Sequence, residues 1–441
     1  MKMDRTKLLM VLSEALDRVE GELLGVTDHH AKRVAWISVK MGRLLRLAED
    51  ELSLLAVSAL LHDSALNEYR EGYGDRENRP LSAIRGHCTA GEKNVGMIPG
   101  CQQEKNFVLY HHECADGNGP FGKTEVETPL GAQIIHVADV ADRTFDLSRM
   151  DSEKMAAVRD YVKRETGRLF GETVSRAFLE ILAENELDQL SDSSIASLQL
   201  EVPECYCETD LRILSELFAQ IIDYKSPFTK NHSIGLAEKA ETMARYYGWS
   251  EELVQEIYCA GALHDIGKLM VDRDVLEKPG KLDQGEYRHI QSHAYETYRL
   301  LSRLESMGNI LEWASYHHEK LNGTGYPFGK TASELDQQAR LLACLDIYQA
   351  LTEDRPYKAG MPHSRVMGIL REMAEKNELD PEITESIGQV FQREEEGETT
   401  QQQALFQCSV CGHIYEGAML PEGYVCPVCG QSVTAFLRLF S

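Results

Sequence analysis

The chain has 441 residues, of which 43% are hydrophobic and 27% charged, so it is long enough to bury two or three cores and is not a disordered or fibrous sequence. Its 46 basic and 71 acidic side chains give a formal charge of −25, which argues against binding to DNA and against docking on anionic membranes. The longest apolar run, residues 52–61, is much shorter than the roughly 20 residues that cross a bilayer, and the first residues show no signal-peptide pattern. We therefore expect a cytoplasmic protein of several domains.

The first predicted unit, residues 1–150, contains the motifs LLHDSAL and HHECADGNGPFG. Apolar residues from Leu52 onward recur every three or four positions and lead to His62, which is typical of one face of an α-helix. A single histidine on such a face is more often a structural core residue than a metal ligand. Residues 151–204 follow; they are charged and poor in Gly and Pro, which predicts connecting helices.

The second predicted unit, residues 205–392, repeats both motifs as ALHDIGKL and HHEKLNGTGYPFG. The separation between matching landmarks is nearly constant, from 202 positions between His62 and His264 to 207 positions for the last matching aspartates. Landmarks that repeat in one order at one spacing indicate a duplicated domain. No alternating strand pattern occurs before residue 400, so both units are predicted to be helical.

Histidines and aspartates form two parallel sets of candidate metal ligands. The set in the first unit is His30, His62, Asp63, His87, His111, His112 and Asp139. The set in the second unit is His232, His264, Asp265, His293, His317, His318 and Asp346. Ten of the 15 histidines fall in these sets. Histidines with a purely structural role would not be expected to recur in two parallel sets, so the pattern favours metal ligands. Imidazole with carboxylate suits Fe, Mn, Ni or Zn, and seven ligands are too many for one ion, so we expect two ions in the second unit and metal in the first.

The segments HDIGK, HHE…GTGYP and DIYQALTEDRPY of the second unit together resemble the HD-GYP domain, a branch of the HD phosphohydrolases. The resemblance implies a helical domain that binds divalent ions, expected to be Fe or Mn in this chain. It also implies an enzyme that hydrolyses cyclic dinucleotides, above all cyclic di-GMP. It implies that Asp265 bridges two ions while a water activated by both attacks phosphorus. The remaining ligands would divide into His232, His264 and Asp346 for one ion, and His293, His317 and His318 for the other.

Phosphate-binding residues are also implied by the resemblance. Lys268 lies four residues after His264, so we expect both on one face of a continuing helix, with the lysine reaching a phosphate oxygen beside the metals. Arg355 and Lys358 match family positions that contact substrate phosphate; without the motif they would be interpreted as a solvated surface pair. Asp265 and Lys268 are thus the expected catalytic residues.

The first unit departs from the family pattern. Leu66 stands where the second unit has Lys268, its Gly-rich turn lacks the tyrosine, and DRPYK has no counterpart. The first unit thus keeps the metal ligands but lacks the phosphate-binding groups, so we expect a degenerate HD domain. Its role would be regulatory or structural, or it would act on a different substrate.

The C-terminal part is predicted to be a flexible linker, residues 393–404, followed by a metal module, residues 405–436. The module has the spacing CxxC-x14-CxxC, a strong four-thiolate signature formed by Cys408, Cys411, Cys426 and Cys429. It resembles a short rubredoxin or the tail of rubrerythrins, which implies one iron. A structural zinc ribbon uses the same ligands, so both metals stay open.

The sequence thus predicts a mainly α protein with two tandem HD-type helical bundles, followed by a small four-cysteine module of rubredoxin or zinc-ribbon type. The leading function is a cyclic di-GMP phosphodiesterase, with redox control through the module as an added expectation. The alternative is a di-iron HD-type oxygenase that receives electrons from the module. The phosphate-binding residues favour the phosphodiesterase, because an oxygenase does not need them. Expected partners are the cyclic dinucleotide and an electron donor or a diguanylate cyclase.

Overall fold

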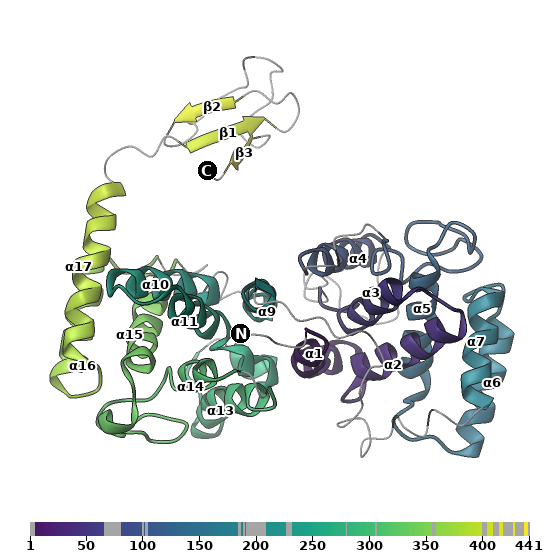
Figure 1. The fold of residues 1–441 in the computed structure, drawn as a ribbon, viewed down its shortest axis with the longest axis horizontal. Helices are drawn as coiled ribbons and strands as arrows, with labels where there is room; N and C mark the ends of the chain where they lie inside the picture. Colours follow the sequence, from purple (N-terminus) through teal and green to yellow (C-terminus); the bar gives the residue numbers. More distant parts are fainter. Residues whose placement is uncertain are drawn as a thin grey trace.

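The fold of the chain, taken from a computed structural model, is mainly helical (Figure 1). The structure describes residues 5–65, 81–98, 101, 105–183, 187, 190, 209–225, 232–278, 280–304, 307–354, 359–398, 404–408, 414–417, 427 and 436–439. Within these residues, named strands occur only after residue 403, so the predicted fold class is confirmed. None of the described helices is long and apolar enough to span a bilayer.

The first bundle contains the ligand set of the first unit. Its helices are α1 (Arg5–Leu24), α2 (His30–Leu44), α3 (Glu49–Leu60), α4 (Leu81–Gly96), α5 (Leu130–Phe145), α6 (Ser152–Glu165) and α7 (Glu172–Ala183). Helix α2 packs between α3 and α5, with Val34, Ile37 and Met41 fully buried. The first turn of α3 consists of three acidic residues, which suits the positive end of a helix dipole.

The second bundle repeats this arrangement. Its elements are α9 (Thr209–Lys225), α10 (His232–Tyr246), α11 (Glu251–Leu263), the 3-10 helix η3 (Ile266–Met270), α12 (Arg273–Leu276), α13 (Gln284–Leu301), α14 (Asn309–Ser315), the 3-10 helix η4 (Ala332–Glu334), α15 (Gln337–Thr352), α16 (His363–Glu375) and α17 (Pro381–Glu398). Side-chain caps begin three of them: Ser250 for α11, Asp283 for α13 and Asp336 for α15. These caps fix the helices that hold the ligands.

Two predicted boundaries differ from the structure. Helices α6 and α7, expected to connect the units, pack on each other and against α5, so they extend the first bundle. Helix α17 continues through Glu398 into the expected linker, because the glutamates of this segment are good helix formers. The three-stranded sheet of the tail follows the end of α17 (Figure 1). Its order is β2 (Ile414–Gly417), β1 (Ala404–Cys408), β3 (Phe436–Leu439), and both pairs are antiparallel.

Helix α1 contacts both bundles. It packs against α2 and α3 of its own bundle and against η3, α9 and α13 of the other, and it lies at the inner edge of the first bundle (Figure 1). Glu14 forms ion pairs with Lys32 of α2 and with Arg303, which lies just beyond α13. A nitrogen of the Arg18 guanidinium lies 2.9 Å from a carboxylate oxygen of Asp272, the residue that directly precedes α12. The two bundles are therefore joined by a shared helix as well as by the chain.

Candidate metal centres

The centre of the second bundle is formed by side chains from five different segments. His232 begins α10, Asp346 lies in α15, and His293 lies in α13, while His264 and Asp265 separate α11 from η3 and His317 and His318 follow α14. His318 is partly exposed, and the exposure of the other six residues does not exceed 7%. The structure thus brings together all seven predicted ligands of the second unit.

Asp265 lies at the middle of this group, and its two carboxylate oxygens face different histidines. Oδ2 is 3.1 Å from Nε2 of His264 and 3.9 Å from Nε2 of His232. Oδ1 is 3.4 Å from Nε2 of His293. The two groups expected from the sequence each lie close together, His232 with His264 and Asp346, and His293 with His317 and His318. A third close set, His264, Asp265 and His317, links the two groups.

The expectation of one continuing helix through His264 and Lys268 is wrong. Helix α11 ends at Leu263, and the backbone turns at Asp265 into the 3-10 helix η3, which carries Lys268. The turn brings Lys268 Nζ onto Oδ2 of Asp265 instead of placing it above His264. Gly267 makes the turn possible: a Cβ there would lie 1.9 Å from the carbonyl oxygen of His293. The corresponding residue of the first bundle is Ala65.

Backbone carbonyls orient the imidazole rings. Nδ1 of His264, His293 and His317 lies 2.7, 2.5 and 2.7 Å from the carbonyl oxygen three residues earlier. Because Nδ1–H donates to these carbonyls, the lone pair on Nε2 faces the centre, as a metal ligand requires. Burial lowers the pKa of His293 to about 3, so this ring is neutral at physiological pH.

The donor set fits a divalent cation. Burial alone would raise the pKa of Asp265, but the neighbouring His264 ring and the Lys268 ammonium hold this pKa well below its usual range, so the carboxylate is ionised. Among the described residues, Nε2 of His264 and Oδ1 of Asp265 are buried without a hydrogen-bond partner. Nε2 of His293 and Nε2 of His317 face each other at 3.2 Å, which requires a proton or a cation between the two lone pairs.

Two supporting carboxylates were missed in the sequence. Glu353 Oε2 lies 3.2 Å from Nδ1 of His232, and Asp142 Oδ2 lies 2.6 Å from Nδ1 of His30. Asp142 follows the ligand Asp139 by three positions on α5, so both lie on one helical face. Glu353 follows the ligand Asp346 by seven positions and comes directly after the end of α15. That spacing was the available signal, and it was overlooked because acidic residues are common on solvated faces.

Glu319, the third residue of the HHE motif, holds the Gly-rich turn in place. Its carboxylate accepts hydrogen bonds from the backbone N–H groups of Phe328, Gly329 and Lys330 at 2.7, 3.1 and 2.9 Å. The turn in turn positions Tyr326, whose ring centre is 4.7 Å from that of His318. In the first bundle Glu113 makes the same type of contact with a turn that lacks the tyrosine.

We expect Glu319→Ala to lower the free energy of unfolding by about 2–3 kcal/mol, because three backbone N–H groups lose the buried carboxylate that accepts their hydrogen bonds. Activity should also fall, since Tyr326 would no longer be held against His318. Chemical denaturation followed by circular dichroism measures the first effect. Glu334→Ala is the control: this exposed residue caps the neighbouring η4, and its loss should cost about 1 kcal/mol or less. Equal losses in both variants would contradict the role given to Glu319.

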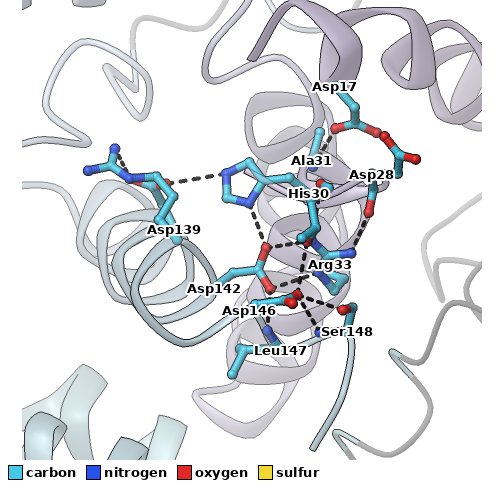
Figure 2. Close-up of polar contacts among 12 residues, drawn as sticks. Asp17, Asp28, His30, Ala31, Arg33, Asp139, Asp142, Asp146, Leu147 and Ser148 are labelled. Carbon is cyan, nitrogen blue, oxygen red and sulfur yellow. Dashed lines mark hydrogen bonds and ion pairs between the residues drawn. The ribbon is translucent and has the colours of Figure 1, made fainter. Parts of the chain in front are cut away.

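The centre of the first bundle has the same plan with different support. Asp63 Oδ1 lies 3.0 Å from Nε2 of His87, and Asp139 Oδ1 lies 3.3 Å from Nε2 of His30. Figure 2 shows His30 between Asp139 and Asp142, with Arg33 on the far side of Asp142. His62 and His111 are also fully buried at this centre, and His112 is next to them.

The supporting ion pair of the first bundle is absent from the second. The guanidinium of Arg33 is fully buried and pairs with both oxygens of Asp142, at 2.7 and 2.9 Å. The corresponding residues of the second bundle are Gly235 and Gln349. The centres therefore have matching ligands but different surroundings.

Some of the other predicted site residues lie outside the residues that the structure describes. These are Leu66, Arg355, Lys358, Cys411, Cys426 and Cys429, whereas Cys408 is the last residue of β1.

Comparison with known families assigns the three parts. HD domain family models match residues 27–144 and residues 216–383, and the rubredoxin-like domain of rubrerythrin matches residues 406–436. The chain is a tandem HD-domain protein with a rubredoxin-like tail. The predicted recognition is thereby confirmed.

Some similar proteins align with most of this tandem HD protein, and others align with part of it. A 3'3'-cGAMP-specific phosphodiesterase 1 of Vibrio cholerae is 29% identical over 391 residues, covering 85% of this chain and 89% of the relative. A cyclic di-GMP phosphodiesterase of Pseudomonas aeruginosa is 36% identical over 158 residues, which cover 35% of this chain and 37% of that protein. A crystal structure of a cyclic GMP-AMP specific phosphodiesterase of V. cholerae superposes with a TM-score of 0.62 at 25% identity, covering 89% of this chain and 98% of that one.

Proposed function

We propose that this tandem HD-domain protein is a metal-dependent phosphodiesterase that hydrolyses cyclic dinucleotides at the centre of its second bundle. The observation that carries the proposal is the position of Asp265, whose oxygens face two separate ligand groups while the Lys268 ammonium lies directly beside it. An arrangement of two cation sites and a fixed ammonium suits the charge that develops on a phosphoryl group. The similarity to cyclic-dinucleotide phosphodiesterases supports the same reaction class.

The residues around this centre have distinct roles in the proposed reaction. Two divalent ions, held by the seven ligands, would lower the pKa of a shared water and neutralise charge on the phosphoryl group. Lys268 donates to a phosphate oxygen once Asp265 is engaged as a ligand, and its positive charge strengthens that hydrogen bond. Glu353 holds the His232 ring in one orientation. Tyr326 presents an apolar ring beside His318, which limits the access of water to this side of the centre.

For the substrate, the sequence favoured cyclic di-GMP, whereas the relatives that align with both bundles are named for 3'3'-cGAMP. The cyclic di-GMP enzyme of P. aeruginosa aligns with about a third of the chain. We therefore propose a 3'3'-linked cyclic dinucleotide as substrate, with cyclic GMP-AMP preferred over cyclic di-GMP. The first bundle, which lacks the tyrosine of the turn, is proposed to have no hydrolytic activity of its own.

The test uses full-length protein loaded anaerobically with Fe or Mn and incubated separately with each cyclic dinucleotide, with products resolved by chromatography. Linear dinucleotides or mononucleotides, formed faster from cyclic GMP-AMP, are the expected result. Faster turnover of cyclic di-GMP would instead support cyclic di-GMP as the preferred substrate, as expected from the sequence. Oxygen consumption without hydrolysis of either compound would favour the di-iron oxygenase instead.

Redox control through the rubredoxin-like tail is the second part of the proposal. Four thiolates around iron form a one-electron centre, and its electrons could keep iron in the HD centre reduced. Aerobically purified protein is expected to show a reddish absorption that dithionite removes and that Cys408→Ser lacks. Phosphodiesterase activity should then differ between the oxidised and reduced forms. A colourless tail with stoichiometric zinc would leave a structural ribbon, and equal activity in both states would remove the switch.

A further inference from the structure

The thiol of Cys88 lies among the histidines of the first centre. Cys88 follows His87 on α4, and both side chains are fully buried. Four residues each offer one donor atom such that all four atoms lie within 4.8 Å of one another: His87, Cys88, His111 and His112. The nitrogen and sulfur ligands of a tetrahedral zinc ion are about 3.3–3.6 Å apart, so a modest contraction would bring these donors around one ion.

The contact between the thiol and His111 is not an ordinary hydrogen bond. Cys88 Sγ lies 3.9 Å from Nδ1 of His111, whereas the carbonyl oxygen of Val108 lies 2.5 Å from the same nitrogen. Because the carbonyl oxygen is the closer and better acceptor, Nδ1–H donates to Val108, and Nε2 carries the lone pair. Within the described part of the chain, this buried Nε2 makes no hydrogen bond, and Oδ1 of Asp63 is 3.8 Å away. A cation bound by both the sulfur and the imidazole would stabilise this arrangement.

The second bundle provides an internal comparison. An offset of 206 positions relates the histidines on this side of the two centres. At the same offset Cys88 corresponds to Ala294, which is also fully buried. The matching group of candidate ligands in the second bundle has only the three imidazoles, of His293, His317 and His318. The thiol is therefore specific to the first centre, and neither the packing of the helix nor the histidine cluster requires it.

We propose that Cys88 binds the cation held by His87, His111 and His112 in the first bundle, so that this ion has three imidazole ligands and one thiolate ligand. Binding releases the thiol proton to solvent, because a thiolate and not a thiol coordinates the metal. Sulfur donors favour thiophilic ions, so this site binds Zn²⁺ in preference to Mn²⁺.

A role for this ion follows from the number of its ligands. Structural zinc sites have four protein ligands, whereas catalytic sites keep one position open for water or substrate. The first centre therefore holds a zinc ion that stabilises its bundle, which agrees with Leu66 at the position of Lys268. The proposal concerns the bundle without assigned hydrolytic activity, and it stands or falls independently of the reaction proposed for the second bundle.

The test uses Co²⁺ as a coloured substitute for Zn²⁺, because a bond between cobalt and a thiolate gives a charge-transfer band in the near ultraviolet. The full chain carries serine in place of the four tail cysteines, which then cannot contribute to the band: Cys408, Cys411, Cys426 and Cys429. Titration of the metal-free protein with Co²⁺ should give a band equivalent to one thiolate per chain. Cys88→Ala, which copies the second bundle, should lack the band while its circular dichroism remains helical. Cys101→Ala, which removes another buried thiol of the first bundle, is the matched control and should keep the band.

Competition between ions measures the preference of the site. Stoichiometric Zn²⁺ should remove the cobalt band, whereas the same concentration of Mn²⁺ should leave it. Competition with a chelator should show that Cys88→Ala binds one Zn²⁺ roughly 10²-fold or more weakly, because a ligand matters at least as much as the residues that support it. The same variant should show a smaller rise in melting temperature on addition of Zn²⁺. Absence of the band from the tail-substituted protein would overturn the proposal, and so would a band that persists in Cys88→Ala. Displacement of Co²⁺ by Mn²⁺ as readily as by Zn²⁺ would overturn the assignment of zinc.

Discussion

Asp265→Ala is expected to reduce cyclic-dinucleotide hydrolysis by roughly 10³-fold or more, because one substitution removes the carboxylate that faces both ligand groups. The loss should appear in kcat and should be accompanied by a lower content of bound metal in the second bundle. Circular dichroism should remain helical, since Asp265 follows the end of α11 and its side chain stabilises the centre, not a helix. Steady-state kinetics and metal analysis of the purified variant measure both effects.

Asp63→Ala is the matched control, because Asp63 has the corresponding position in the first bundle and its Oδ1 lies 3.0 Å from Nε2 of His87. Its activity should stay within about 10-fold of the wild type if chemistry takes place in the second bundle alone. A folded Asp265→Ala protein with normal turnover would disprove the assignment. Equal losses in the two variants would show that both bundles take part in catalysis.

Lys268→Leu, which copies the first bundle, is expected to lower kcat/KM by roughly 10²–10³-fold while the metal content stays at the wild-type level. The reason is that the ammonium supplies one fixed, charged donor beside the reacting phosphate, whereas the seven ligands remain. Lys268→Arg keeps the charge and should recover part of the activity. Kinetics with the preferred cyclic dinucleotide and metal analysis provide the two readouts.

Lys278→Leu serves as the control for this series, because Lys278 is in the same part of the chain but pairs with Glu286 at the surface. It should behave like the wild type. Loss of metal in Lys268→Leu would instead mean that the lysine acts by holding Asp265, with which it forms an ion pair.

The ligand sets and the duplicated architecture could be predicted because they depend on short motifs with fixed spacing. The HD motif formed by His264 and Asp265 can be identified from the sequence alone. In the structure these two residues lie close to other predicted ligands that are far from them in sequence. The path of the chain between His264 and Lys268 could not be predicted in this way. It depends on the close approach of Gly267 to the backbone of α13, a contact between segments that are far apart in sequence.

The supporting residues were harder to predict than the ligands. Asp142 and Glu353 belong to no recognisable motif, and an acidic residue on or beside a helix is usually solvated. Only packing shows that their carboxyl groups point inward, to His30 and His232. The end of the first bundle could not be predicted for the same reason. Helices as charged as α6 and α7 resemble connecting helices in sequence, and only the structure shows which of their residues are buried.

The shared helix α1 bears on how the protein unfolds. It covers part of the first bundle with one face, and with another it contacts η3, the segment that carries Lys268. If the first bundle opens, α1 loses the packing that keeps it folded, and η3 then loses its cover as well. The thermodynamic stabilities of the two halves are thus linked, so the order of the segment beside Asp265 depends on the folded state of the other bundle.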